Sequence, residues 1–226
     1  MSAEPKRGVV IAIDGPAGAG KSTLARALAV ELGLPYVNTG LMYRSVAAAA
    51  LSAGTDPQDA AALEDLARGL RFSVGDGEPP SLRVEGGPPQ EALTSAEVEG
   101  VVSMVARHPE VRSVLRAEQR RLGAGGSVME GRDIGTVVFP DADVKLFLLA
   151  EPDERAARRQ TERGSDDPSL AHALERRDAL DARTNPLVPA SDARVVDTSG
   201  RGPEEVLEEV LALVREATGG GSPGRG

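Results

Sequence analysis

The spacing of hydrophobic residues along the chain predicts alternating strands and helices. Short apolar, largely β-branched runs are typical of buried parallel strands, and they fall at residues 9–13, 34–37, 127–130, 144–149 and 194–196. Residues 21–32 have a helical composition, with Leu24, Leu28 and Leu32 at i, i+4 and i+8 and Gly33 as a stop. Further helices are predicted at residues 41–53, 57–70, 95–107, 109–122, 152–163, 170–183 and 203–217.

Strands separated by helices indicate an α/β fold with a five-stranded parallel sheet that is flanked by helices. Residues 71–92 break the alternation, because two strand-like runs between glycine- and proline-rich turns predict a small antiparallel β insertion. We expect a single domain with a core at about 8–40, 124–150 and 190–217, an insertion-bearing region at about 41–123, a helical lid at about 151–185 and a disordered tail at 218–226.

Composition narrows the classes of function. The 226 residues include no cysteine and only two histidines, which excludes disulfides, thiolate chemistry and most histidine-built metal centres. A net charge of −9 opposes binding to nucleic acid, which requires a basic surface. No apolar run approaches the roughly 20 residues of a membrane span, or a signal-peptide core. We expect a soluble, cytoplasmic monomer with no nucleic-acid or membrane partner.

A glycine-rich loop separates the first predicted strand from the first predicted helix. Its sequence, Gly15-Pro-Ala-Gly-Ala-Gly-Lys21-Ser22, matches the phosphate-binding pattern G-x-x-x-x-G-K-[ST] in its required context. Glycines let backbone N–H groups turn toward a phosphate, and the helix N-terminus adds partial positive charge. Lys21 suits the β- and γ-phosphates of ATP, and the Ser22 hydroxyl suits Mg²⁺. The predicted ATP-binding residues are Gly15, Pro16, Ala17, Gly18, Ala19, Gly20, Lys21, Ser22 and Thr23.

Other residues separate the classes of P-loop protein. The guanine-reading motif Asn-Lys-x-Asp of GTPases is excluded, because the only lysines are Lys6, Lys21 and Lys145 and none lies in it. A second set of candidate anion-binding groups favours a kinase, namely Arg44, Arg112, Arg132, Arg155, Arg158, Arg159 and Arg163. These residues alone leave open a nucleotide kinase, another small-acceptor kinase such as one for shikimate, and a P-loop module that acts as a nucleotide-binding switch.

Three further motifs resemble those of bacterial cytidylate kinases. They are Thr39-Gly-Leu-Met-Tyr-Arg44, Glu130-Gly-Arg-Asp-Ile-Gly-Thr-Val-Val-Phe-Pro140, and Arg176-Arg-Asp-Ala-Leu-Asp181 through Pro186-Leu-Val-Pro189. The resemblance extends in order over about residues 9–215 and includes the β insertion, which in that family enlarges the nucleoside monophosphate domain. It implies a nucleoside monophosphate kinase-like fold and phosphorylation of CMP and dCMP by ATP with Mg²⁺.

The resemblance also implies roles for individual residues. Six side chains would surround the acceptor CMP: Thr39, Arg44, Ser103, Arg112, Arg132 and Asp133. Arg44 and Arg132 would bind its phosphate, because guanidinium groups match phosphate oxygens bidentately. Ser103, Arg112 and Asp133 would lie on or near the cytosine, whose amino group is a donor.

Arg177 and Asp181 are implied to bind the ribose hydroxyls, although their i, i+4 spacing is equally typical of a surface ion pair. Two positions depart from the family pattern. Asn38 replaces an aspartate that is common before the Thr-Gly step. The family pattern has an arginine a few residues after the position of Asp181, and here the spacing is about one residue shorter. Arg183 matches that arginine only if the alignment is shifted by this residue.

Positively charged side chains are predicted to promote the phosphoryl transfer. An acceptor phosphate is already an anion, so in-line transfer of the γ-phosphoryl group needs positioning and positive charge and no general base. We predict Lys21, Arg155 and Arg159 to be the catalytic residues, with a salt-bridged surface helix as the alternative for the two arginines. Ser22 and Glu130, which ends a strand like a Walker B acid, are the predicted Mg²⁺ residues, and Asp14 competes for that role.

Overall fold

The computed structural model describes residues 8–163, 179–180 and 187–219. Most of the helix predicted at 170–183 and most of the predicted tail lie outside these residues. The predicted site residues Arg177, Asp181 and Arg183 also lie outside them.

A seven-stranded sheet with the order β3-β4-β2-β5-β1-β6-β7 forms the centre of the molecule. Five neighbouring parallel strands form its core: β2 (Tyr36–Asn38), β5 (Ser127–Gly131), β1 (Val10–Asp14), β6 (Val144–Leu149) and β7 (Arg194–Asp197). All five agree with the predicted strands to within two residues at each end. The predicted α/β fold and its five parallel strands are therefore confirmed, although the sheet that contains them has seven strands.

The insertion forms the antiparallel hairpin that was predicted, from β3 (Arg71–Gly75) and β4 (Ser81–Glu85). The hairpin also extends the central sheet, because β4 lies parallel to β2 with Tyr36 opposite Ser81. The backbone N–H of Tyr36 donates to the Pro80 carbonyl at 2.8 Å. The sequence pattern did not predict this junction, which rests on one residue pair.

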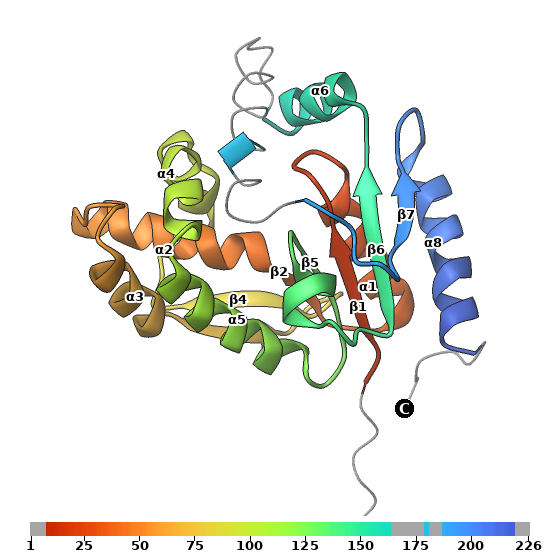
Figure 1. Ribbon diagram of the computed structural model, residues 1–226, viewed down its shortest axis with the longest axis horizontal. Helices are drawn as coiled ribbons and strands as arrows, with labels where there is room; N and C mark the ends of the chain where they lie inside the picture. Colours follow the sequence, from red (N-terminus) through yellow and green to blue (C-terminus); the bar gives the residue numbers. More distant parts are fainter. Residues whose placement is uncertain (1–7, 164–178, 181–186, 220–226) are drawn as a thin grey trace, which may run out of the picture.

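Two helices cover one face of the parallel strands. Helix α1 (Lys21–Leu32) follows β1, and helix α8 (Pro203–Ala217) lies beside β7 (Figure 1). The fully buried side chains of Ile11, Leu28, Leu146 and Val210 belong to the core cluster between these helices and the sheet. This packing follows from the apolar stripe on α1 and the continuous apolar runs in β1 and β6.

Four more helices gather at the side of the sheet away from α8 (Figure 1). They are α2 (Thr39–Ala53), α3 (Ala60–Gly69), α4 (Ala96–Ala106) and α5 (Pro109–Gly123), with a 3₁₀ turn at Gln90–Thr94 before α4. Their apolar faces form a second core cluster that includes Met42, Val46, Leu63, Val105 and Leu115. This region therefore has a hydrophobic core of its own beside the sheet.

The carboxyl ends of the central strands meet at one edge of the sheet. The phosphate loop follows β1, and a π-helical turn (Ile134–Val138) follows β5. Helix α6 (Pro152–Arg163) follows β6 and lies above its end (Figure 1). Ligands of open α/β sheets bind in the crevice outside these strand ends. The π-helical turn occupies the most family-specific motif and was not predicted as an element.

Candidate active site

The phosphate loop requires glycine at several positions. Gly15, Gly18 and Gly20 have φ angles of 145°, 77° and 85°. A Cβ on Gly18 would lie 2.8 Å from the carbonyl oxygen of Arg155, so both the conformation and the contact with α6 exclude a side chain there. Gly20 is the N-cap of α1, which directs the helix N-terminus into the loop. The Lys21 ammonium donates across the loop to the Pro16 carbonyl at 2.7 Å.

A cavity of about 270 Å³ lies between this loop and the helices beyond β2. Its phosphate-loop side is lined by Ala17, Gly18, Gly20, Lys21, Ser22 and Thr23. Its opposite side is lined by Thr39, Arg44, Ser103, Arg112, Arg132 and Asp133. One cavity therefore brings together a cationic phosphate loop and a separate group of arginines.

Glu130 lies between the two sides, at the end of β5. Its carboxylate is buried and accepts a hydrogen bond from the Tyr36 phenol. Asn38 donates to the same phenol oxygen at 3.2 Å, and the Ser22 hydroxyl also forms a hydrogen bond with it. Burial, then the charge of Glu130 and the hydrogen bond to it, raise the pKa of Tyr36 well above its ordinary value. Tyr36 therefore remains a neutral phenol, which donates a hydrogen bond to Glu130 and also bonds to Ser22.

The strand ends of β1 and β5 are tied to each other by two side chains. Both carboxylate oxygens of Asp14 accept backbone hydrogen bonds, from Ile134 and Gly135, at 2.8 Å each. Burial raises the pKa of Asp14 to about 6, while these two hydrogen bonds and Lys21 act in the opposite direction. In return, Arg132 Nη1 donates to the Gly15 carbonyl at 2.6 Å. The loop that carries Arg132 is thus fixed against the phosphate loop.

The arginines on the far side of the cavity are held by buried or partly buried partners. Arg44 donates from Nη1 to the Leu93 carbonyl and from Nη2 to Glu99 Oε1, both at 2.9 Å. The Asp133 carboxylate accepts from Arg112 at 3.0 Å and from Arg116 at 2.6 Å. These contacts position the guanidinium groups in the unliganded protein, so part of the cost of ordering them is met before a ligand binds.

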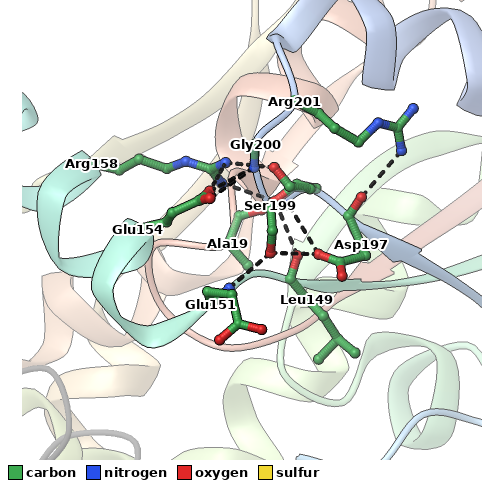
Figure 2. A network of polar contacts seen from close by, with 10 residues as sticks. Ala19, Leu149, Glu151, Glu154, Arg158, Asp197, Ser199, Gly200 and Arg201 are labelled. Atoms are coloured by element: carbon green, nitrogen blue, oxygen red, sulfur yellow. Dashed lines mark hydrogen bonds and ion pairs between the residues drawn. The ribbon is translucent and has the colours of Figure 1, made fainter.

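Helix α6 is anchored to the loop after β7, as Figure 2 shows. Arg158 donates to the side chain and the carbonyl of Thr198 at 2.9 and 2.7 Å, and Thr198 in turn donates to the Ala19 carbonyl at 3.3 Å. Glu154 accepts the Gly200 N–H at 2.8 Å. These bonds connect the helix through Thr198 to the phosphate loop.

The arginines of α6 differ in placement. Arg159 lines the cavity. Arg155 is buried against the phosphate loop, where its Nη1 donates to the Ala17 carbonyl at 3.0 Å. Arg158 belongs to the anchoring network instead, including an ion pair with Glu154 at 3.2 Å. Of the two predicted catalytic arginines, Arg155 therefore contacts the phosphate loop and Arg159 lines the cavity beside it.

Comparison with known proteins places the sequence in a family. The family described as Cytidylate kinase matches residues 11–216. The chain belongs to the cytidylate kinase family. It is 45% identical over 214 residues to the cytidylate kinase of Pelotomaculum thermopropionicum, covering 90% of this chain and 95% of that relative.

Some relatives in this family are longer. The chain is 49% identical over 222 residues to the bifunctional pantoate ligase/cytidylate kinase of a Synechococcus strain. That match covers 92% of this chain but 45% of the relative, so the chain spans less than half of the bifunctional protein's length. Among solved structures, a gluconokinase from Sinorhizobium meliloti has a TM-score of 0.51 at 16% identity, covering 95% of this chain and 96% of that one. This likeness concerns the fold alone.

The structure brings most of the predicted residues of this cytidylate kinase family member to one cavity. Of the predicted ATP-binding residues, Gly15, Pro16 and Ala19 belong to the loop without lining the cavity. The predicted metal residues Ser22 and Glu130 line it together. Asp14, the alternative metal ligand, does not line the cavity. Both of its carboxylate oxygens accept hydrogen bonds from backbone N–H groups. Among the described helices, none is long and apolar enough to cross a membrane.

Two contributors were not identified from the sequence. Tyr36 was assigned to a buried strand, and nothing in the strand pattern indicates that its phenol contacts Glu130. Arg116 shares Asp133 with Arg112, and the i, i+4 spacing of the two arginines was the available signal. Asn38, the departure from the family pattern, caps α2 by accepting the Leu41 N–H at 3.2 Å and contacts Tyr36 through its amide.

Proposed function

We propose that this chain catalyses the cytidylate kinase reaction, transferring the γ-phosphoryl group of ATP to the phosphate of CMP or dCMP. The observation that carries the proposal is the shared cavity, in which Lys21 and the phosphate loop face Arg44, Arg112, Arg132 and Asp133 in a member of this family. Two anionic nucleotides require two cationic sites with a common opening between them. The cavity supplies this arrangement.

The acceptor side suits a cytidine monophosphate. Arg44 and Arg132 offer guanidinium groups to a phosphate, and their partners Glu99 and the Gly15 carbonyl hold them in place. Asp133 and Ser103 offer a carboxylate and a hydroxyl to the amino group of cytosine. We assign the ribose hydroxyls to Arg177 and Asp181, with Arg183 near them, on the family resemblance.

The chemistry follows from charge and position. The acceptor phosphate is an anion near neutral pH, so the chain needs no general base. Lys21 would stabilise the negative charge of the β- and γ-phosphates, and Arg159 would extend positive charge over the transferring group from the same cavity. Arg155 would support the transfer indirectly, by holding the Ala17 carbonyl of the phosphate loop.

Mg²⁺ fits this site as a companion of ATP. In the described part of the chain, no group of three or more carboxylates or histidines could hold a metal ion. Mg²⁺ in kinases takes most of its ligands from phosphate oxygens and water, so one hydroxyl and one carboxylate suffice. Ser22 and Glu130 line the cavity and share the Tyr36 phenol as a hydrogen-bond partner. When bound, the ion would neutralise part of the negative charge on the phosphates of ATP.

A coupled assay tests the proposal. The chain is incubated with ATP, Mg²⁺ and, one at a time, CMP, dCMP, UMP, AMP, GMP and shikimate, and ADP formation is measured. CMP and dCMP are expected to support the fastest turnover. Fastest turnover with shikimate or a purine nucleotide would indicate another small-acceptor kinase. Slow hydrolysis that no acceptor stimulates would indicate a nucleotide-binding switch.

A further inference from the structure

A second cavity, of about 340 Å³, lies at the corner between α4 and α5. Within the described part of the chain it is lined by Arg107, Pro109, Arg112, Ser113, Arg116 and Arg120. We call it the arginine pocket. Four guanidinium groups surround one hollow whose lining contains no carboxylate among these residues. Such a concentration of positive charge is notable in a chain with a net charge of −9.

The helices create this concentration by their geometry. Arg112, Arg116 and Arg120 recur at i, i+4 and i+8 on α5, and Arg107 is the C-cap of α4. Like charges at this spacing repel each other, and an anion bound among them would remove that repulsion. Helix α5 begins at Pro109, so its N-terminal partial positive charge points to the same corner.

Contacts inside the fold account for only part of this cluster. Arg112 and Arg116 each direct one amino group to Asp133. Arg120 donates to the Val137 and Val138 carbonyls of the π-helical turn, at 2.9 and 3.1 Å. Nε of Arg116 is buried with no hydrogen-bond partner among the described residues.

Arg107 is the member of the cluster that the interior does not use. Its side chain is exposed, while its backbone N–H bonds to the carbonyl of Val105. The exposed hydroxyl of Ser113 lines the same hollow. A guanidinium and a hydroxyl at an open rim, with further guanidinium groups deeper inside, are the donors that bind phosphate oxygens.

We propose that the arginine pocket binds a phosphate or diphosphate anion, and that its occupation weakens CMP binding through Arg112. Arg112 lines both the arginine pocket and the active-site cavity. An anion that attracts Arg112 and Arg116 competes with Asp133, which both residues contact. Because coupling between two binding sites is reciprocal, bound CMP would lower the affinity for the anion by the same factor. The coupling, but not the anion binding, rests on the proposed function.

Calorimetry tests the binding itself. Pyrophosphate, and in a parallel experiment inorganic phosphate, is titrated into the full chain saturated with a non-hydrolysable ATP analogue, so that the phosphate loop is occupied. We expect saturable binding of one anion, weakened at least about tenfold by Arg107→Glu and weakened less by Ser113→Ala. Arg215→Glu, a charge reversal of an exposed residue in the last turn of α8, is the matched control and should bind as the wild type does.

Two results would overturn the assignment: no saturable binding by the wild type, or equal affinity in the wild type and Arg107→Glu. Steady-state kinetics at saturating ATP tests the coupling. The anion should raise the KM for CMP about threefold or more in the wild type and leave it unchanged in Arg107→Glu. An unchanged KM with the pocket occupied would contradict the coupling. Calorimetry needs no turnover, so its result is independent of whether CMP is the acceptor.

Discussion

The phenol of Tyr36 donates a hydrogen bond to the carboxylate of Glu130, so a residue of β2 holds the acid at the end of β5. The same phenol contacts Ser22 of the phosphate loop. The two residues proposed to hold Mg²⁺ are therefore connected by one buried side chain. Such a shared hydrogen-bond partner would keep the two proposed Mg²⁺ ligands in position.

Removing the Tyr36 hydroxyl is expected to lower the apparent affinity of the enzyme for Mg²⁺. Tyr36→Phe keeps the buried ring and deletes the donor, so we expect the Mg²⁺ concentration for half-maximal activity to rise by about tenfold or more. The measurement is a Mg²⁺ titration of CMP phosphorylation at fixed ATP. An unchanged Mg²⁺ requirement, with the melting temperature retained, would show that the phenol does not act through Glu130 and Ser22.

Glu99 is expected to position Arg44 for the acceptor phosphate. Glu99→Gln replaces the charged partner of Arg44 Nη2 with a neutral amide, so the ion pair is lost while the bond to the Leu93 carbonyl is retained. We expect the KM for CMP to rise about tenfold while kcat changes little, because the loss of a charge-assisted hydrogen bond affects acceptor binding. Glu97→Gln, an exposed change in the first turn of the same helix, is the control. Equal kinetics of the two variants would contradict this role.

Substitutions of Arg155 and Arg159 in α6 are expected to have different effects on kcat and on thermal stability. Arg159→Gln should lower kcat by about 100-fold with little loss of thermal stability, because its charge lies in the cavity. Arg155→Gln should lower both kcat and the melting temperature, because Arg155 is buried and holds the Ala17 carbonyl. Kinetics and thermal melts of both variants decide this. A stability effect alone in Arg159→Gln would favour the salt-bridged surface helix.

Asp14 is expected to make stability fall as pH rises. Its pKa is raised from 3.8 to about 6, so in the interval between these values the folded protein binds more protons than the unfolded chain. The contribution of this group to the free energy of unfolding therefore decreases by about 3 kcal/mol in total, from below about pH 4 to above about pH 6. Asp14→Asn should lack this decrease.

Urea unfolding of the wild type and Asp14→Asn at several pH values checks this prediction. The variant loses one acceptor for a backbone N–H, so its free energy of unfolding differs from that of the wild type at every pH. Only the change of this difference with pH tests the prediction. Stability is the better readout than activity because the acceptor phosphate itself titrates near pH 6. A difference that is constant with pH would contradict the raised pKa.

Local patterns were sufficient to predict the parallel sheet, the hairpin and the phosphate loop. Apolar runs of β-branched residues define β1 and β6, and glycines at positions 15, 18 and 20 with Lys21 define the loop. These features depend on neighbouring residues in the sequence, and spacing reports them directly.

Long-range side-chain pairs could not be derived in this way. Tyr36 and Glu130 are separated by 94 positions, and Asp14 and Gly135 by 121. Each pair depends on the order of strands in the sheet, which hydrophobic periodicity does not specify. The placement of Ser103 and Arg112 in the cavity followed from the family resemblance, because an isolated serine or arginine on a helix carries no signal of its own.

We propose that one cavity holds ATP and CMP with their phosphates facing each other across Lys21. The decisive experiment is a crystal structure of the full chain with CMP and a non-hydrolysable ATP analogue. We expect the analogue's triphosphate in the phosphate loop and the CMP phosphate between Lys21 and the guanidinium groups of Arg44 and Arg132. A pyrimidine nucleotide bound elsewhere, with its phosphate turned away from Lys21, would contradict it.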